Sequence, residues 1–131
     1  MRISDFVMGK DKVFIIAEIG NNHNGNFELA LKMIDAAVDA GADCVKFQMR
    51  DMESVYRKKS LFKDGEDLGT EYILDLLKRF QLTLDEHRKI AQYCLENNVL
   101  YMCTPWDTES IAVLEGFEVP AYKVASADLT N

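Results

Sequence analysis

Polar side chains collect where four short apolar segments of this sequence end. They are Glu18, Asn21, Asn22 and His23 at the first segment, Lys46 and Gln48 at the second, Thr104, Trp106 and Asp107 at the third, and Lys123, Ser126 and Asp128 at the fourth. In parallel α/β folds, ligands bind beyond the carboxyl ends of the strands. The sequence therefore predicts that all four segments contribute to one ligand-binding rim.

Two lysines are the most informative of these residues. Lys46 lies in CVKFQ and Lys123 in AYKVA, two segments that are otherwise mainly apolar. An ammonium group is costly to bury unless it is paired. Two interior cations would bind a phosphate and a carboxylate together, or one lysine would form a Schiff base with a carbonyl substrate. The structural alternative is that the lysines pair with Glu18 or Asp128, or extend to the surface.

The neighbouring polar residues fit the same chemistry. Strand alternation places Lys46 and Gln48 on one face of the second segment, while Val45 and Phe47 point toward helices. Glu18 is interpreted as a general acid or base, as a hydroxyl-recognition group, or as a structural partner for a lysine. The hydroxyls of Thr104 and Ser126 follow strands, where such groups and nearby backbone N–H groups hold phosphates.

The two histidines carry less information. His23, in the loop NNHNG, is a candidate metal ligand or base, but the Asn/Gly setting favours a hydrogen-bonded organiser of the loop. His87 lies between Glu86 and Arg88 and is expected on the solvated surface. No metal ligands are therefore assigned within this chain. Trp106 either lines a pocket or covers the rim.

Hydrophobic periodicity and caps define the elements that position these residues. Buried strands are expected at 13–19, 44–47, 99–103 and 121–125. Helices are expected at 27–40, from Thr70 to Phe80, from the Thr83/Glu86 capping box onward, and at 108–115, and residues 50–69 are expected to form a loop that can include a helical turn. Continuously apolar strands separated by helices indicate a parallel sheet covered by helices. The loop GNNHNGN carries neither common phosphate-binding glycine pattern. A segment of a barrel and an open sheet both remain compatible with this order.

Composition limits the possible partners and the size of the fold. The chain has 131 residues, 48% hydrophobic and 28% charged, and a net charge of −7, so a nucleic-acid partner is not expected. No segment reads as a membrane span or signal peptide, which indicates a cytoplasmic protein. The three cysteines, Cys44, Cys94 and Cys103, are expected to be reduced core residues. The length is roughly half of the ~250 residues of a closed eight-stranded barrel.

Four motifs together resemble the N-acylneuraminate (sialic acid) synthase family. They are AEIGNNHNG from Ala17, KFQ from Lys46, TPWD from Thr104, and YKVASADLTN from Tyr122. The similarity runs from Val13 to Asn131, and the set is specific although each motif alone is not. It implies an α/β fold of the parallel TIM-barrel type, with residues 1–131 forming about half of a (β/α)₈ barrel with four strands.

The resemblance also implies an activity. The family condenses phosphoenolpyruvate with an N-acylmannosamine-type sugar and releases phosphate. By motif, Lys46, Thr104, Lys123 and Ser126 would hold phosphoenolpyruvate, Gln48 and Asp128 would face the sugar, and Glu18 would lie among the reacting groups. The family often has Glu at the position of Asp128. A divalent metal, Mn²⁺ or Mg²⁺, is expected in the full-length enzyme, on ligands that lie downstream in the second half of the barrel.

Further expectations concern the chain by itself. The second half-barrel and a C-terminal antifreeze-like domain are expected to be missing, so that this chain alone is inactive. Two alternatives stay open: a Schiff-base aldolase-type barrel and a non-catalytic half-barrel that assembles with another half. Open strand edges and an apolar inner face predict a homo-oligomer.

Overall fold

The structure is a computed structural model that describes residues 2–7, 9, 13–55 and 75–129. The loop expected at 50–69 and the beginning of the helix expected from Thr70 lie largely outside these residues. Within the described part, a short helix α2 spans Met52–Val55, and residues 75–79 are helical. No helix in these described ranges is long and apolar enough to cross a bilayer.

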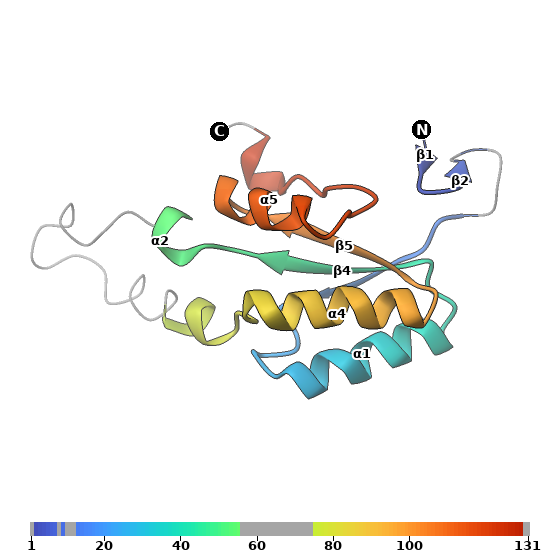
Figure 1. Ribbon diagram of the computed structural model, residues 1–131, viewed down its shortest axis with the longest axis horizontal. Helices are drawn as coiled ribbons and strands as arrows, with labels where there is room; N and C mark the ends of the chain where they lie inside the picture. Colours follow the sequence, from blue (N-terminus) through green and yellow to red (C-terminus); the bar gives the residue numbers. More distant parts are fainter. Residues whose placement is uncertain (1, 8, 10–12, 56–74, 130–131) are drawn as a thin grey trace, which may run out of the picture.

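Three parallel strands form the central sheet, in the order β3-β4-β5 (Figure 1). They are β3 (Ile16–Gly20), β4 (Cys44–Met49) and β5 (Leu100–Pro105). Each lies within or beside a predicted apolar segment, so the first three strand predictions are confirmed. Parallel pairing brings the carboxyl ends of all three strands to the same edge, beside α2.

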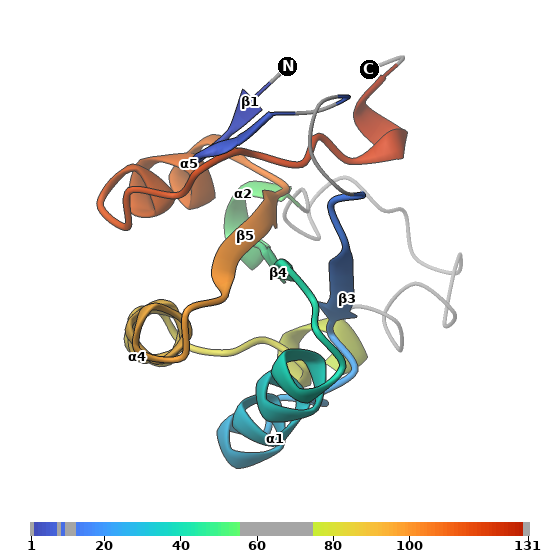
Figure 2. The same ribbon diagram turned by 90° about the vertical axis from the view of Figure 1, so that its right-hand side faces the viewer.

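Three helices follow the strands in the predicted order. They are α1 (Phe27–Asp39), α4 (Leu84–Glu96) and α5 (Thr108–Glu115). Asn26 and Asp107 cap α1 and α5 by accepting backbone N–H groups, and Thr83 and Glu86 form the predicted capping box of α4. Figure 2, which looks along the strands, shows α1 and α4 side by side on one side of the sheet.

The hydrophobic core lies between these helices and the sheet. Val45 and Phe47 of β4 are fully buried and belong to one cluster with Ile34 of α1 and Ile90 of α4. This placement confirms that the odd-numbered residues of β4 point to the helices. The even-numbered residues Lys46 and Gln48 therefore face the other side of the sheet.

Two features differ from the sequence-based expectation. A short antiparallel hairpin, β1 (Arg2–Ile3) and β2 (Phe6–Val7), precedes the sheet and was not anticipated. The strand expected at 121–125 is reduced, in the described part of the chain, to one parallel bridge between Cys103 and Tyr122. The 3₁₀ helix Ser126–Asp128 begins directly after this segment, so regular extended pairing with β5 does not continue.

The loop between β3 and α1 packs tightly on the segment before α4. Gly25 has a φ of +74°, and a Cβ added to it would lie 2.3 Å from the carbonyl oxygen of Arg79. A side chain at this position would collide with backbone, which explains the glycine. This contact holds the loop that carries His23 against the segment before α4.

Candidate active site at the carboxyl ends of the strands

The parallel register brings four of the predicted site residues together. Glu18 of β3 is paired with Lys46 of β4, and Gln48 of β4 is paired with Thr104 of β5. Gln48 and Thr104 lie next to last in their strands, and Glu18 and Lys46 lie further back, beneath the rim that the sequence predicted. Three separate sequence motifs therefore converge at one place.

Lys46 lies at the centre of this group. Its Nζ is 2.5 Å from Glu18 Oε2 and donates to Thr104 Oγ1 at 3.2 Å. The lysine side chain is only 9% exposed, whereas that of Glu18 is 54% exposed. The ion pair is the arrangement that the structural alternative described, a lysine paired with Glu18. The Lys46 ammonium group is therefore enclosed, beside a carboxylate that reaches solvent.

Buried neighbours keep this cation in place. Thr104 is 4% exposed, and Met102, which is paired with Lys46 in the sheet, is 5% exposed. A cation held in a poorly hydrated setting interacts strongly with an anionic ligand. Lys46 and Thr104 together thus offer a charged donor and a hydroxyl to a phosphate or carboxylate group.

Sequence reasoning missed Arg50, which directly follows β4 and contacts the rim residue Gln48. Its Nη2 donates to Gln48 Oε1 at 2.8 Å, and its guanidinium lies 4.2 Å from the ring centroid of Trp106. Strand alternation offered a signal for it, because residues 46, 48 and 50 follow one another at a spacing of two. Trp106 therefore contributes to the rim as a platform for an arginine.

The loops after β4 and β5 are joined directly. The backbone N–H of Trp106 donates to the Met49 carbonyl at 3.1 Å, and that of Asp51 donates to Asp107 Oδ2 at 2.7 Å. Asp107 also caps α5 by accepting from the backbone N–H of Ser110 at 2.7 Å. One carboxylate thus fixes the beginning of α5 relative to the end of β4.

His23 organises the loop after β3. It is 1% exposed, its Nδ1 accepts from the Gly25 N–H at 3.1 Å, and its ring stacks on Phe47. Burial lowers the pKa of His23, so the neutral ring is favoured. This arrangement supports the interpretation of His23 as a loop organiser.

The surface position expected for His87 is wrong. His87 is 1% exposed, and its Nδ1 lies 2.9 Å from the Tyr101 hydroxyl. The reason is helical spacing: His87 shares the buried stripe of α4 with Ile90 and Cys94. Burial lowers its pKa from 6.5 to about 4.

The structure places the last three predicted site residues on the segment after β5. The Lys123 backbone N–H donates to the Cys103 carbonyl at 3.3 Å, but its side chain is exposed and its Nζ donates to the Val124 carbonyl. Ser126 and Asp128 lie in a short 3₁₀ helix, Ser126–Asp128. The interior position expected for Lys123 therefore does not occur here, because the strand that would bury it is not formed.

The described residues do not form a metal site. Among them, no group of three or more His, Cys, Asp or Glu side chains is placed to hold an ion. Glu18, the carboxylate nearest to the rim centre, is occupied by Lys46 at 2.5 Å. The side chains present here therefore do not fit a divalent metal.

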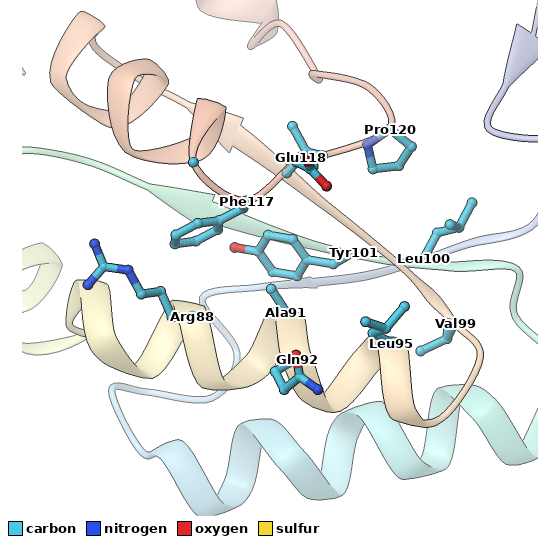
Figure 3. A pocket seen from close by; sticks show the side chains of 12 residues that line it. Arg88, Ala91, Gln92, Leu95, Val99, Leu100, Tyr101, Phe117, Glu118 and Pro120 are labelled. Carbon is cyan, nitrogen blue, oxygen red and sulfur yellow. The ribbon is translucent and has the colours of Figure 1, made fainter.

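A groove of about 370 Å³ lies elsewhere on the molecule (Figure 3). It runs between α4 and the segment after α5, over Tyr101 and Phe117, whose ring centroids are 6.3 Å apart. Val99 and Leu100 line it at the beginning of β5, whereas Thr104 lies near the end of that strand. The groove is thus separate from the rim that carries Lys46.

The comparisons with known proteins agree with this geometry. The model of the NeuB family matches residues 33–131. The chain belongs to the NeuB family. Two relatives of this NeuB-family chain are the N,N'-diacetyllegionaminic acid synthase of Campylobacter jejuni, 34% identical over 92% of the chain, and the spore coat polysaccharide biosynthesis protein SpsE of Bacillus subtilis, 36% identical over 99%.

The chain spans about a third of these relatives, 37% of the first and 35% of the second. The crystal structure of the N-acetylneuraminic acid (sialic acid) synthetase of Leptospira borgpetersenii, in complex with citrate, superposes with a TM-score of 0.79 at 30% identity. That match covers 96% of this chain and 42% of the synthetase. The expected resemblance and the α/β fold of the TIM-barrel type are confirmed, with a parallel sheet of three strands in the described part in place of the expected four.

Proposed function

We propose that this chain supplies the phosphoenolpyruvate-binding part of a nonulosonic (sialic-type) acid synthase. The proposal is carried by the buried Lys46, whose Nζ contacts Glu18 and Thr104 at the carboxyl end of the sheet. It is supported by membership in the NeuB family and by relatives named as synthases of legionaminic acid and of N-acetylneuraminate 9-phosphate. The chain then corresponds to the N-terminal part of the barrel, residues 1–131.

The proposed reaction joins an enol to an aldehyde. The methylene carbon of phosphoenolpyruvate attacks the aldehyde carbon of an open-chain N-acylmannosamine-type sugar, forming a carbon–carbon bond. Water adds to the carbon that carries the phosphate, and the tetrahedral intermediate expels inorganic phosphate. Developing and existing negative charge must be neutralised throughout, which is the task of fixed cations and donors.

Individual residues take separate parts in this proposal. Lys46 and Thr104 bind phosphoenolpyruvate, Gln48 faces the sugar, and Glu18, beside Lys46, lies among the reacting groups. Lys123 and Ser126 would complete the phosphoenolpyruvate site, and Asp128 the sugar site, once the segment after β5 is held as a regular barrel strand. Its single bridge at Tyr122 starts the required parallel pairing.

A divalent metal is part of the proposed full-length enzyme but not of this site. As the family resemblance implies, we place its ligands in the downstream part of the barrel. Such a metal would polarise the sugar aldehyde. The residues of this chain hold and orient phosphoenolpyruvate independently of it.

Binding of phosphoenolpyruvate to the 131-residue chain tests the proposal. Calorimetric titration is expected to show binding that Lys46→Met weakens about 30-fold or more, since a charge-assisted contact is lost. Lys32→Met, which removes an exposed lysine of α1, is the matched control and should leave affinity unchanged. Equal affinities in all three proteins would contradict the assignment of Lys46. We expect no phosphate release from the chain alone with Mn²⁺ and N-acetylmannosamine.

The Schiff-base alternative makes a different prediction. An ammonium group engaged by a carboxylate, as Lys46 is by Glu18, has no lone pair with which to attack a carbonyl. Borohydride treatment with pyruvate should therefore leave the mass of the chain unchanged. A covalent adduct on Lys46 or Lys123 would favour the aldolase.

Assembly with a second copy is a further candidate function. β3 pairs with β4 alone in the described sheet, and Ile16 on this edge is 41% exposed. Val124 and Leu129, beyond β5, are 60% and 77% exposed. Unpaired edges with apolar side chains favour association. Sedimentation velocity should show a homo-oligomer, and a monodisperse monomer would contradict this expectation.

A further inference from the structure

We propose that Arg50 is a positioning residue, which fixes the side-chain amide of Gln48 so that its N–H donors face the ligand. The ligand named here, the sugar, rests on the proposed function. The amide orientation itself rests on the contacts of Gln48 alone. The two can therefore be tested separately.

The orientation follows from the chemistry of the guanidinium group. Arginine carries donors and no acceptor, so the Gln48 atom that faces Arg50 Nη2 at 2.8 Å must be the carbonyl oxygen. The amide nitrogen then points the other way. A Cβ built on Gly20 would lie 3.4 Å from Gln48 Nε2 and 3.2 Å from Glu18 Oε1. Nε2 therefore lies toward Gly20 and Glu18, at the edge of the site that contains Lys46.

Arg50 is itself held by the next loop. Its guanidinium lies on the ring of Trp106, 4.2 Å from the centroid. The backbone N–H of Trp106 in turn donates a hydrogen bond to the Met49 carbonyl at the end of β4. A stacked guanidinium keeps its planar fork in one orientation. Trp106 thus supports Arg50, and Arg50 orients Gln48, across the gap between the loops after β4 and β5.

This arrangement sets what Gln48 can recognise. With its oxygen engaged by Arg50, Gln48 presents donors and selects a ligand atom that accepts a hydrogen bond, such as a hydroxyl or N-acyl carbonyl oxygen of an amino sugar. A freely rotating amide would accept or donate equally well. Arg50 therefore restricts Gln48 to ligand atoms that accept a hydrogen bond, without itself contacting the sugar.

Nuclear magnetic resonance on the isotope-labelled 131-residue chain tests the orientation without requiring activity. The Gln48 side-chain amide is assigned by its loss in Gln48→Glu. We expect nuclear Overhauser contacts between its Nε2 protons and the Gly20 Hα protons, which Arg50→Met should abolish. Arg50→Lys, which keeps one donor, should retain them in part. Arg88→Met, which removes an arginine of α4, is the control and should leave them unchanged.

The outcomes separate this inference from the proposed function. If the Gln48–Gly20 contacts are unchanged in Arg50→Met, Arg50 does not orient the amide. If the Met variant does not fold, Arg50→Gln replaces it, because that side chain is too short to reach both Trp106 and Gln48. N-acetylmannosamine affinity should fall about tenfold in Arg50→Met while phosphoenolpyruvate affinity changes about twofold or less. If the unaltered chain does not bind this sugar, the proposed sugar role of Gln48 fails, and the amide contacts still decide the role of Arg50.

Discussion

Lys46 Nζ lies 2.5 Å from Glu18 Oε2, yet the two side chains are unequally buried, at 9% and 54% exposure. The lysine is thus enclosed by the sheet, while its partner reaches solvent. Solvent therefore reaches this ion pair from the side of Glu18. This open side of the ion pair is what the proposed anion-binding role of Lys46 requires.

Substitutions of this pair should separate stability from binding. Glu18→Gln leaves a buried cation with a neutral partner and should lower the free energy of unfolding by about 1–2 kcal/mol, a modest value because Glu18 is half exposed. Lys46→Met replaces the cation with an apolar side chain of similar size and should change stability by about 1 kcal/mol or less. Urea unfolding of both variants measures this. If Lys46→Met were the more destabilising of the two, Lys46 would be a structural residue.

Stability should depend on pH through His87. Its pKa is about 4 in the folded chain and about 6.5 when unfolded, so the unfolded state binds the proton first as the pH falls. The contribution of the neutral His87 ring to the free energy of unfolding is complete above pH 6.5 and is lost progressively down to about pH 4. Between pH 7 and pH 5 the free energy of unfolding should fall by about 2 kcal/mol from this group.

The neighbours of His87 define the control for this effect. Tyr101 contacts its Nδ1, Phe47 packs edge-on against it, and His23 and Glu86 act on its charge. Burial also lowers the pKa of His23, so protonation of His23 likewise lowers the free energy of unfolding as the pH falls. His87→Gln should therefore reduce the pH dependence of urea unfolding without removing it. An unchanged slope in that variant would contradict a buried, neutral His87.

Two glycines provide a matched test of close packing at the loop after β3. Gly25 and Gly41 have similar positive φ values, +74° and +77°, but a Cβ on Gly25 would lie 2.3 Å from the Arg79 carbonyl oxygen, whereas one on Gly41 would meet open space. Gly41→Ala should cost about 1 kcal/mol through backbone strain alone. Gly25→Ala should cost about 2 kcal/mol or more, because backbone must move as well. Equal midpoints in urea unfolding would show that the contact with Arg79 is not made.

The cysteines should resist alkylation while the chain is folded. Cys44, Cys94 and Cys103 are buried, and burial raises the pKa of each thiol to about 12. The thiolate is the reactive form, so it is scarce at pH 8. Mass spectrometry after iodoacetamide treatment should show no carbamidomethyl groups in buffer and three in urea. Rapid modification in buffer would indicate an opened core.

Local patterns in the sequence were sufficient for β3, β4 and β5, for α1, α4 and α5, and for the faces of β4, but not for the hairpin of β1 and β2. Apolar runs, capping residues and two-residue alternation act over a few residues, which is why the capping box at Thr83 and the inward position of Lys46 were predicted correctly. The three cysteines also lie in the core, as their apolar segments indicated. The family motifs added the expectation that Glu18 and Lys46 share a site.

Tertiary structure decided what depends on a second segment of the chain. His87 is buried because Tyr101 and Phe47 lie against α4, and Arg50 joins the rim because Trp106 comes from another loop. Lys123 is exposed because the strand around it has one bridge with Cys103 in the described chain and no regular pairing beyond it. The sequence by itself determined which residues alternate and where elements begin. Only packing decided which charges are enclosed, since burial depends on the neighbours that distant segments provide.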